Sequence, residues 1–380
     1  MKIIFAGHLG RWAIGGGAWY HMQYLRGLFQ LGHEVFYLED CGRESWVYNW
    51  DSGEMTNDLT YPAAYIQSCL EPLGLGGKWI YRTQDRSEGM AAGDFMDVCV
   101  EADLLIVHGV PLDYWRPEYS WPGRRIFVDI DPGFTQIGLA NGDPALTNTI
   151  ARCESVFTFG QSILSENSCI PDCGRRWLKT VPPVSLMDWP YVMEAADAVY
   201  FTCVMQWRGF RDVTHEGVLY GQKDREFPKF LDLPRLTSQR FRMALTGEPQ
   251  TNLSEHGWEV VPGNVPSRTP WSYREFIQRS RAEFGVAKHG YVLMQGGWFS
   301  DRSVCYLASG RPVLLQDTGL DRWLPTGEGV VTFRSVREAL DGIDRINSDY
   351  ERHRRSARAL AERYFATERV LPRLLDDAMS

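Results

Sequence analysis

The first forty residues contain the feature that most constrains the fold: a short apolar run, a glycine-rich turn, a helix and a second apolar run. Residues 3–6 (IIFA) predict a buried strand, and residues 18–31 carry apolar side chains at helical spacing. Gly32 is placed to end that helix in the left-handed conformation, and residues 34–38 predict a second strand. Such strand–loop–helix–strand units build doubly wound parallel sheets, so the sequence predicts an α/β fold.

The same alternation continues along the chain in two series. Further strands are predicted first at residues 103–107, 125–130 and 155–159, and then at residues 198–205, 241–245, 258–261, 283–287 and 311–315. Prolines cluster at residues 180–190, and because proline resists both helix and strand, this segment predicts a linker. We therefore expect one Rossmann-like domain over residues 1–185 and a second over residues 191–348.

Two segments lie outside this alternation. Residues 42–95 are irregular and rich in Trp, Tyr and Gly, and we expect them to cover the edge of the first sheet. Residues 349–375 predict a long, arginine-rich helix that Pro372 should kink. We treat residues 349–380 as a separate C-terminal helical segment.

The charge balance lowers the expectation of a nucleic-acid binder. The formal net charge is −8, whereas proteins that grip nucleic acid through its phosphates are usually basic. A local exception is the group of five arginines at positions 352, 354, 355, 358 and 363, for which the solvated face of a helix is the favoured interpretation. No apolar run is long enough to predict a secretory signal or a membrane span, so we expect a cytoplasmic protein.

The N-terminal glycine-rich turn is a candidate binding loop. Gly15, Gly16 and Gly17 precede a helix, and backbone N–H groups at such a position favour an anionic group. The spacing is not the dinucleotide fingerprint, although Glu39 could supply its acidic residue, so an NAD-dependent oxidoreductase or epimerase is retained as an alternative. His8 is a candidate general base, with a partly buried polar residue as the competing interpretation.

The most specific segment covers residues 280–319. Its strand leads through a glycine loop into a helix that Ser300 can cap, and a diphosphate there would meet free N–H groups, hydroxyls and the Arg302 guanidinium. A carboxylate, Asp301 or Glu283, could bind ribose hydroxyls. The predicted donor-binding residues of this segment are Glu283, Gly297, Trp298, Phe299, Ser300, Asp301, Arg302 and Ser303.

This segment resembles a known family. YLASGRPV at residues 306–313, followed by QDTG, is similar to the donor-binding stretch of GT-B glycosyltransferases. The opening GGG…YLRGLFQLGHEVFYLE is similar to the start of that family. The chain also resembles bacterial and phage-type proteins described only as glycosyltransferases. The resemblance implies two facing Rossmann-like domains, with a C-terminal helix that crosses back to the first. It also implies a nucleoside-diphosphate sugar as donor, with a UDP-sugar expected, and no permanently bound cofactor.

The resemblance places two further cations and reveals one departure. Arg208 and Lys223 occupy positions where the family often has cations against the donor diphosphate, and two cations would offset the charge of the leaving group. Retaining members often carry two glutamates eight residues apart at positions that are Gly297 and Cys305 in this chain. Asp301 is the nearby carboxylate that could replace them.

Polar residues at other strand ends are candidates for the acceptor side of the cleft. Asp129 and Asp131 follow one predicted strand and His108 follows another, and ligands in open α/β sheets bind at these carboxyl ends. Asp131 is a second candidate base, with a turn-forming Asp before Pro-Gly as the alternative. No metal-binding spacing occurs among the His, Cys and acidic residues, so no metal is expected.

These patterns together predict a glycosyltransferase that moves a sugar from a nucleoside-diphosphate donor to a hydroxyl on a small molecule, a glycan or DNA. Within this class, glucosylation of a hydroxymethylated DNA base is an alternative. Outside it, an NAD-dependent enzyme or a non-catalytic protein that binds nucleotide sugars remains possible. The sequence carries no signal for the oligomeric state.

Overall fold

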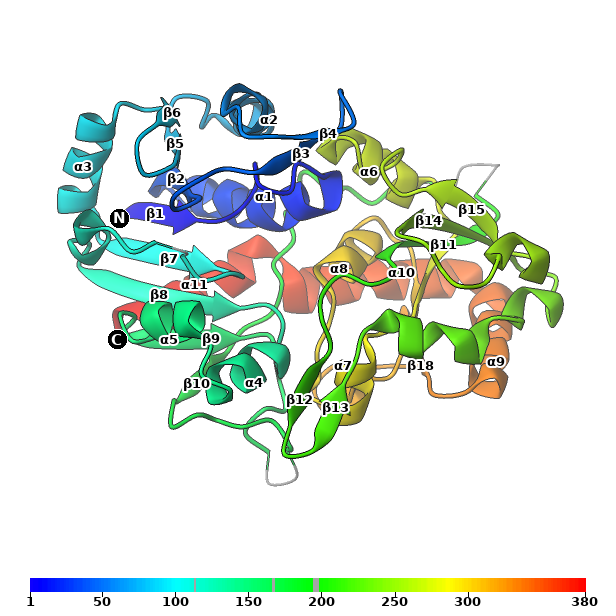
Figure 1. The fold of residues 1–380 in the computed structure, drawn as a ribbon. Coiled ribbons are helices and arrows are strands. Elements are labelled where there is room, and N and C mark those ends of the chain that lie inside the picture. Colours follow the sequence, from blue (N-terminus) through cyan, green and yellow to red (C-terminus); the bar gives the residue numbers. More distant parts are fainter. Residues whose placement is uncertain (113, 166–167, 194–197) are drawn as a thin grey trace.

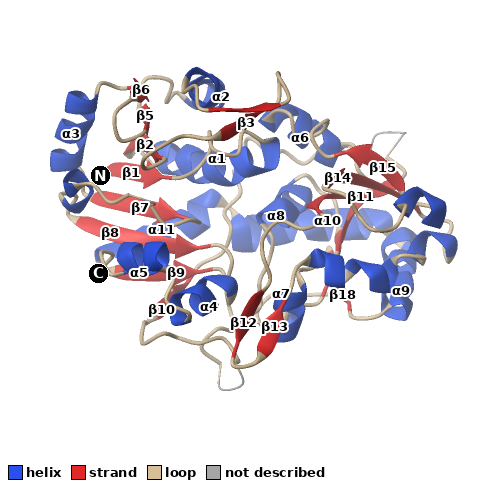
Figure 2. Cartoon of the chain, in the orientation of Figure 1, coloured by secondary structure: helices blue, strands red, loops and turns tan. Residues whose placement is uncertain are grey.

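The chain folds into two α/β halves, each built around a largely parallel β-sheet, which lie side by side in the computed structural model (Figures 1 and 2). The structure describes residues 1–112, 114–165, 168–193 and 198–380. The first sheet contains only strands from the first half of the chain, and the second only strands from the second half. The predicted fold, with two facing Rossmann-like halves, is confirmed.

The first sheet has eight strands in the order β10-β9-β8-β7-β1-β2-β5-β6, and only β6 runs antiparallel to its neighbour. Its strands are β1 (Lys2–Ala6), β2 (Glu34–Asp40), β5 (Trp79–Arg82), β6 (Ser87–Gly89), β7 (Leu104–His108), β8 (Arg124–Asp129), β9 (Ser155–Thr158) and β10 (Trp177–Lys179). The five strands predicted here lie within one or two residues of their expected limits. The segment expected to cover the sheet edge instead forms that edge itself, through β5 and β6.

Alternate side chains of β1 belong to two different cores, as they should in a sheet covered on both faces. Ile3 and Phe5 pack with residues of α1 (Gly15–Gln30) and of the C-terminal helix α11 (Thr367–Met379). Ile4 and Ala6 pack with residues of α3 (Ala92–Glu101) on the other face. This double burial explains why the strand contains only apolar residues after Lys2.

The second sheet is fully parallel, with the order β15-β14-β11-β16-β17-β18. Its strands are β11 (Tyr200–Gln206), β14 (Arg240–Thr246), β15 (Glu259–Pro262), β16 (Ala282–Gly285), β17 (Val313–Gln316) and β18 (Val330–Phe333). The sequence predicted five of them and missed β18. Two small hairpins lie outside the sheets, β3–β4 (Val47–Asn49 and Glu54–Thr56) and β12–β13 (Val213–His215 and Val218–Tyr220).

Helices cover both sheets. The remaining ones are α2 (Thr60–Leu70), α4 (Phe134–Ala140), α5 (Pro144–Ile150), α6 (Pro270–Gln278), α7 (His289–Met294), α8 (Asp301–Ala308), α9 (Val336–Ser348) and α10 (Tyr350–Leu360). Among the described residues, no helix combines the length and apolarity that crossing a membrane requires.

The C-terminal segment runs from the second half of the molecule back to the first (Figure 1). The long helix predicted for this region is interrupted: α10 passes through a π-helical turn, η8 (Ala361–Phe365), and the extended Ala366 separates it from α11. The helix continues through Pro372, so the break lies six residues before the expected kink. Ala366 bridges to Val184 in the proline-rich linker, which ties both connections between the halves together. The domain limits of 1–185, 191–348 and 349–380 stay predictions.

Candidate functional site

The carboxyl ends of both sheets meet at a cleft that residues of both halves line, and polar contacts join the two sides directly. Trp298 Nε1 donates to the Ile130 carbonyl at 3.1 Å, and Lys288 Nζ lies 2.6 Å from Asp131 Oδ1. Ile130 and Asp131 follow β8 of the first sheet, whereas Lys288 and Trp298 flank α7 of the second half. Residues predicted from strand ends in different halves therefore lie in one site.

The predicted donor loop forms one side of a small pocket at the end of the second sheet. Ser300 caps α8 by accepting the Arg302 N–H at 3.2 Å, as predicted. Ser300, Arg302 and Ser303 line one pocket together with the ends of β16 and β17. The buried Ser303 hydroxyl makes no hydrogen bond to the described residues, so it is left to bind a ligand or water.

Gly297, Trp298 and Phe299 of this loop make contacts that shape the loop itself. Gly297 has a φ of +74° and lies beside Trp323, whose Nε1 donates to its carbonyl at 2.9 Å, so a side chain at this position would be strained. Trp298 stacks on Tyr291 with ring centroids 4.2 Å apart. Phe299 is buried and stacks on Phe365, so it supports the loop from behind rather than facing the pocket.

Cationic side chains gather beside this pocket. Arg302 pairs with the fully buried Glu283 at 2.6 Å and donates to the Val204 carbonyl at 2.9 Å. Glu283 therefore holds Arg302 in place through Oε1, while its Oε2 has no hydrogen-bond partner among the described residues and the contact with ribose stays a prediction. The Lys223 side chain makes no ion pair or hydrogen bond to the described part of the chain. Burial, together with the nearby Arg302 charge, lowers the pKa of Lys223 to about 8. An ammonium without a carboxylate partner is poised to bind an anion.

Arg208 and Asp301, also predicted on the donor side, differ in exposure. The Arg208 side chain is 55% exposed and lies 3.5 Å from Asp212 and 3.7 Å from Asp224. Asp301 lies at the N-terminus of α8, where burial raises its pKa. Its carboxylate lines a small pocket between the halves, which is described below.

Lys288 could not be predicted from the sequence, because its partners Asp131, Phe134 and Phe210 come from distant segments. Its ammonium pairs with Asp131 and lies between three rings, Phe134, Phe210 and Tyr291, at about equal distances of 4.9–5.2 Å. Cation–π contacts of this kind attract an ammonium group to the faces of the rings. The Lys288 cation therefore joins the two halves at the cleft.

The two aspartates after β8 have separate roles. Asp129 is fully buried and accepts hydrogen bonds from Thr135, Gln136 and Thr158 at 2.6–2.8 Å, so it orders the strand end and does not face the cleft as predicted. Asp131 is half-buried and bonded to Lys288 and the Tyr291 hydroxyl. Burial raises its pKa, but Lys288 outweighs that effect and holds the pKa below its usual value, which weakens Asp131 as a base.

His8 lies just beyond β1 and is 3% exposed. Its ring contacts the Tyr20 hydroxyl through Nε2, and its buried Nδ1 has no hydrogen-bond partner among the described residues. Its backbone N–H donates to His21 Nε2 at 3.0 Å, while His21 Nδ1 lies 2.8 Å from the Gly17 carbonyl, so the His21 proton resides on Nδ1. Burial, with the neighbouring His21, holds the pKa of His8 well below its usual value, so His8 is neutral at pH 7.

His108 faces a second group of unpartnered polar atoms. Both of its ring nitrogens and the Tyr24 hydroxyl are buried without a hydrogen bond to the described residues. His108, Tyr20 and Tyr24 line a small pocket that Asp301 closes from the second half. Unpaired buried polar atoms are rare in proteins, and this cluster at the cleft is the place where a bound hydroxyl-rich ligand would satisfy them.

The predicted glycine loop is a different structure. Gly15, Gly16 and Gly17 form the first turn of α1, which begins three residues earlier than expected. A Cβ on Gly15 would meet Tyr273 Cβ at 2.8 Å, and one on Gly16 would meet the Tyr273 ring at 3.2 Å. Gly15 and Gly16 therefore let α1 approach α6 of the second half closely, while anion binding by the N–H groups of this turn stays a prediction.

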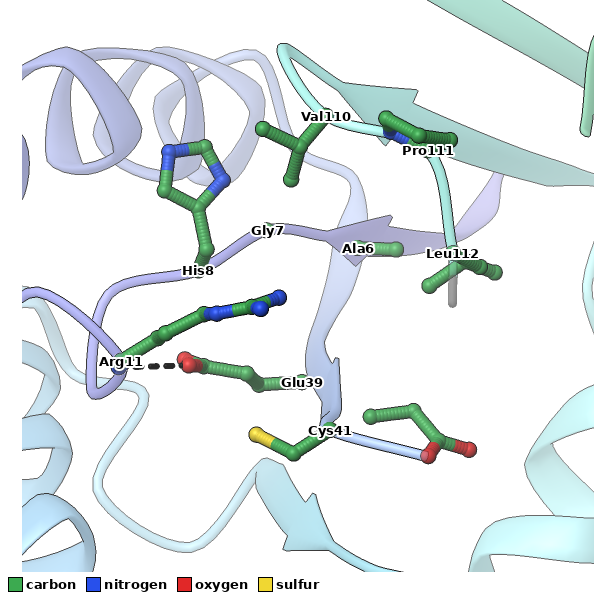
Figure 3. A pocket seen from close by; sticks show the side chains of 10 residues that line it. Ala6, Gly7, His8, Arg11, Glu39, Cys41, Val110, Pro111 and Leu112 are labelled. Carbon is green, nitrogen blue, oxygen red and sulfur yellow. Dashed lines mark hydrogen bonds between the residues drawn. The ribbon is translucent and has the colours of Figure 1, made fainter. Parts of the chain in front are cut away.

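The true loop after β1 closes over Glu39 (Figure 3). Glu39 accepts the N–H groups of Gly10 and Arg11 at 2.8 and 2.7 Å and the Tyr37 hydroxyl at 2.6 Å. Figure 3 shows the His8 ring on one side of this loop and the Arg11, Glu39 and Cys41 side chains on the other. Because the Glu39 oxygens already hold these donors, they are not free to bind the ribose of a dinucleotide.

The predicted arginine patch is divided: two of its five arginines bond inside the molecule, whereas Arg352, Arg355 and Arg363 are exposed. Arg354 is buried and donates to the Val192 carbonyl at 2.5 Å, and Arg358 donates to the carbonyls of Trp189 and Ala308 at 2.9 and 2.7 Å. These side chains hold the C-terminal helix against the linker. In the described ranges, no group of three or more His, Cys, Asp or Glu side chains could hold a metal ion.

Comparison with known proteins agrees with this architecture. Residues 225–373 match the model of a family described as glycosyl transferase-like. This match covers the donor loop, α8 and the crossing helix. No curated protein matches the chain.

Solved structures match over the whole chain at low identity. An α-glucosyltransferase in complex with UDP and a 13-mer DNA has a TM-score of 0.62 at 10% identity, with all of both chains covered. The Anabaena protein HepE in complex with UDP has a TM-score of 0.57 at 13% identity, with 99% of each chain covered. Sucrose-phosphate synthase from Thermosynechococcus elongatus has a TM-score of 0.52 at 12% identity, with all of both chains covered. At such identities the likeness concerns the fold.

Proposed function

We propose that this GT-B glycosyltransferase transfers a sugar from a UDP-sugar to a hydroxyl group of a small molecule or a glycan, with the reaction at the cleft between its two sheets. The observation that carries the proposal is the placement of Lys223 and Arg302 beside the Ser300–Ser303 loop. A diphosphate there would meet two cations, the free Ser303 hydroxyl and the N-terminus of α8. The structures of two fold relatives hold UDP.

In this proposal the leaving UDP is stabilised by charge. As the sugar–phosphate bond breaks, negative charge grows on the β-phosphate, and positioned cations lower the energy of that state. Arg302 is fixed by Glu283 before the donor binds, so little reorganisation is needed. Lys288 adds a third positive charge at the same end of the second sheet.

The acceptor is activated from the first half. We assign the base to His8, since its imidazole is neutral at pH 7 and its Nδ1 has no partner among the described residues. Asp131 is a weaker candidate because Lys288 and Tyr291 already occupy its carboxylate. His108 and Asp301 supply polar contacts to sugar hydroxyls across the cleft.

Binding and turnover of two variants test these roles separately. A thermal-shift panel with UDP, GDP, dTDP, ADP and NAD should show stabilisation by UDP and none by NAD, because a ligand of the folded state raises the melting temperature. Lys223→Met should weaken UDP binding by about 10-fold or more, the worth of one charge-assisted hydrogen bond. His8→Ala should keep the UDP shift while UDP release from UDP-glucose falls about 100-fold or more.

Lys179→Met on the exposed end of β10 is the matched control and should behave as the wild type. Stabilisation by NAD alone would overturn the proposal. Stabilisation by another nucleoside diphosphate would keep the transferase and replace the donor base. UDP binding with no turnover in the wild type would favour a non-catalytic protein.

DNA as acceptor has weaker support in this chain. A fold relative was solved with DNA. In this chain, however, Arg354 and Arg358 of the arginine patch donate to backbone carbonyls inside the molecule, and the net charge is −8. A duplex with hydroxymethylated bases belongs in the acceptor panel for this reason. If the enzyme glucosylated this duplex in preference to simple glycosides, DNA would replace the small molecule or glycan as the proposed acceptor.

A further inference from the structure

A large groove lies on the second half of the molecule and shares no lining residue with the pockets of the cleft. Its volume is about 700 Å³. Its walls are the loop of residues 325–328, the end of α9, one side of α10 and the π-helical turn η8. The proposed transfer reaction does not use this groove, so a ligand that binds there would be a different one from the donor and the acceptor.

Positive charge is the first indication of what the groove binds. Three arginines line it, Arg345, Arg352 and Arg363. Arg352 is paired with Glu328 at 2.5 Å, whereas the side chains of Arg345 and Arg363 make no ion pair or hydrogen bond within the described part of the chain. Arg363 lies over the ring of its neighbour Tyr364 at 5.4 Å, which orients the guanidinium without neutralising it.

A buried donor is the second and independent indication. His353 lines the groove although it is only 3% exposed. Its Nδ1 accepts the Gly329 N–H at 3.3 Å, so the ring proton resides on Nε2. This Nε2–H has no hydrogen-bond partner among the described residues, so a buried donor remains available to the groove.

We propose that this groove is a binding site for a small phosphorylated compound. Phosphate oxygens accept several donors at once, and guanidinium groups with an N–H donor between them match that geometry. Leu360 and Tyr364 supply an apolar wall for the rest of the ligand. Glu328 and Asp349 also line the groove, and their negative charge disfavours a long polyanion.

Calorimetric titration of inorganic pyrophosphate into the full chain, with UDP present at saturation to block the cleft, tests the site. The wild type should bind pyrophosphate, and the double variant Arg345→Gln/Arg363→Gln should bind it at least 10-fold more weakly. Arg337→Gln on the exposed face of α9 is the matched control and should bind like the wild type. Both altered arginines are exposed, and equal melting temperatures would show that the double variant is folded.

Equal affinity of the wild type and the double variant, or no binding at all, would overturn the proposal. Equally strong competition by sulfate would reduce the site to one for any anion and contradict phosphate recognition. Displacement of pyrophosphate by a 20-base-pair DNA duplex would assign the groove to nucleic acid instead. Because Lys223→Met removes only cleft binding, pyrophosphate binding by that variant separates failure of this site from failure of the proposed transfer.

Discussion

At the scale of single residues, Glu39 makes stability depend on pH. Its carboxyl group is 2% exposed, and burial raises its pKa to about 7 from an ordinary value of 4.5. Between these two pH values the folded chain keeps a proton that the unfolded chain has lost. This contribution to stability is therefore complete below pH 4.5 and is lost as the pH rises to about 7, with a size of about 1–3 kcal/mol.

Urea unfolding of the wild type and Glu39→Gln at pH 5 and pH 7.5 measures this contribution. The variant carries no titrating group at this position, so the stability of the wild type relative to the variant should fall by about 1–3 kcal/mol over that range. Glu88→Gln on the exposed strand β6 should show no such change. A constant difference between the wild type and Glu39→Gln would mean that Glu39 ionises normally.

At the scale of elements, the docking of α11 on α1 depends on one glycine. A Cβ on Gly27 would lie 2.7 Å from Thr367 Cβ and closer still to Leu371. Alanine normally stabilises a helix interior by about 1 kcal/mol relative to glycine, but overpacking costs about 1–3 kcal/mol or more. We expect Gly27→Ala to lower the free energy of unfolding, because the clash involves the backbone-fixed Cβ of Thr367 in addition to the mobile end of the Leu371 side chain.

Gly93→Ala is the matched control, since Gly93 also lies in a helix and a Cβ there meets no atom within 4 Å. It should leave the free energy of unfolding unchanged or raise it by up to about 1 kcal/mol. Thermal or urea unfolding of both variants gives the comparison. A stabilised Gly27→Ala variant would contradict the close packing of α1 and α11.

At the scale of the whole molecule, the Asp131–Lys288 pair helps to hold the cleft closed. The pair joins the two halves with side chains that are 31% and 15% exposed. Asp131→Asn should leave Lys288 partly unpaired in its aromatic surroundings and shift the molecule toward a more open state. Small-angle X-ray scattering should then give a larger radius of gyration than the wild type.

Asp341→Asn removes an exposed pair within α9 and should leave the radius unchanged. Addition of UDP to Asp131→Asn should restore part of the compact state if the donor contacts both halves. An unchanged radius for Asp131→Asn would show that the other contacts, such as Trp298 to Ile130, keep the cleft closed alone.

The strands could be predicted because their pattern is local, whereas much of the site depends on distant contacts. The roles of Ile3 and Phe5 in the strand core and of Ser300 as a helix cap follow from the residues next to them in the sequence. Lys288 could not be recognised, because its partner Asp131 lies 157 residues away in the sequence. The packing role of Gly15 could not be predicted for the same reason, since it depends on Tyr273 in the other half of the chain.

The return of the C-terminal segment has a consequence for how this protein is made. Leu371 and Leu374 of α11 belong to the same core as Ile3 and Leu25. During synthesis the chain emerges from its N-terminus, so the first sheet is complete long before the last helix leaves the ribosome. Until α11 emerges, the face of α1 around Gly27 stays uncovered, so the nascent first half exposes this face to chaperones and proteases.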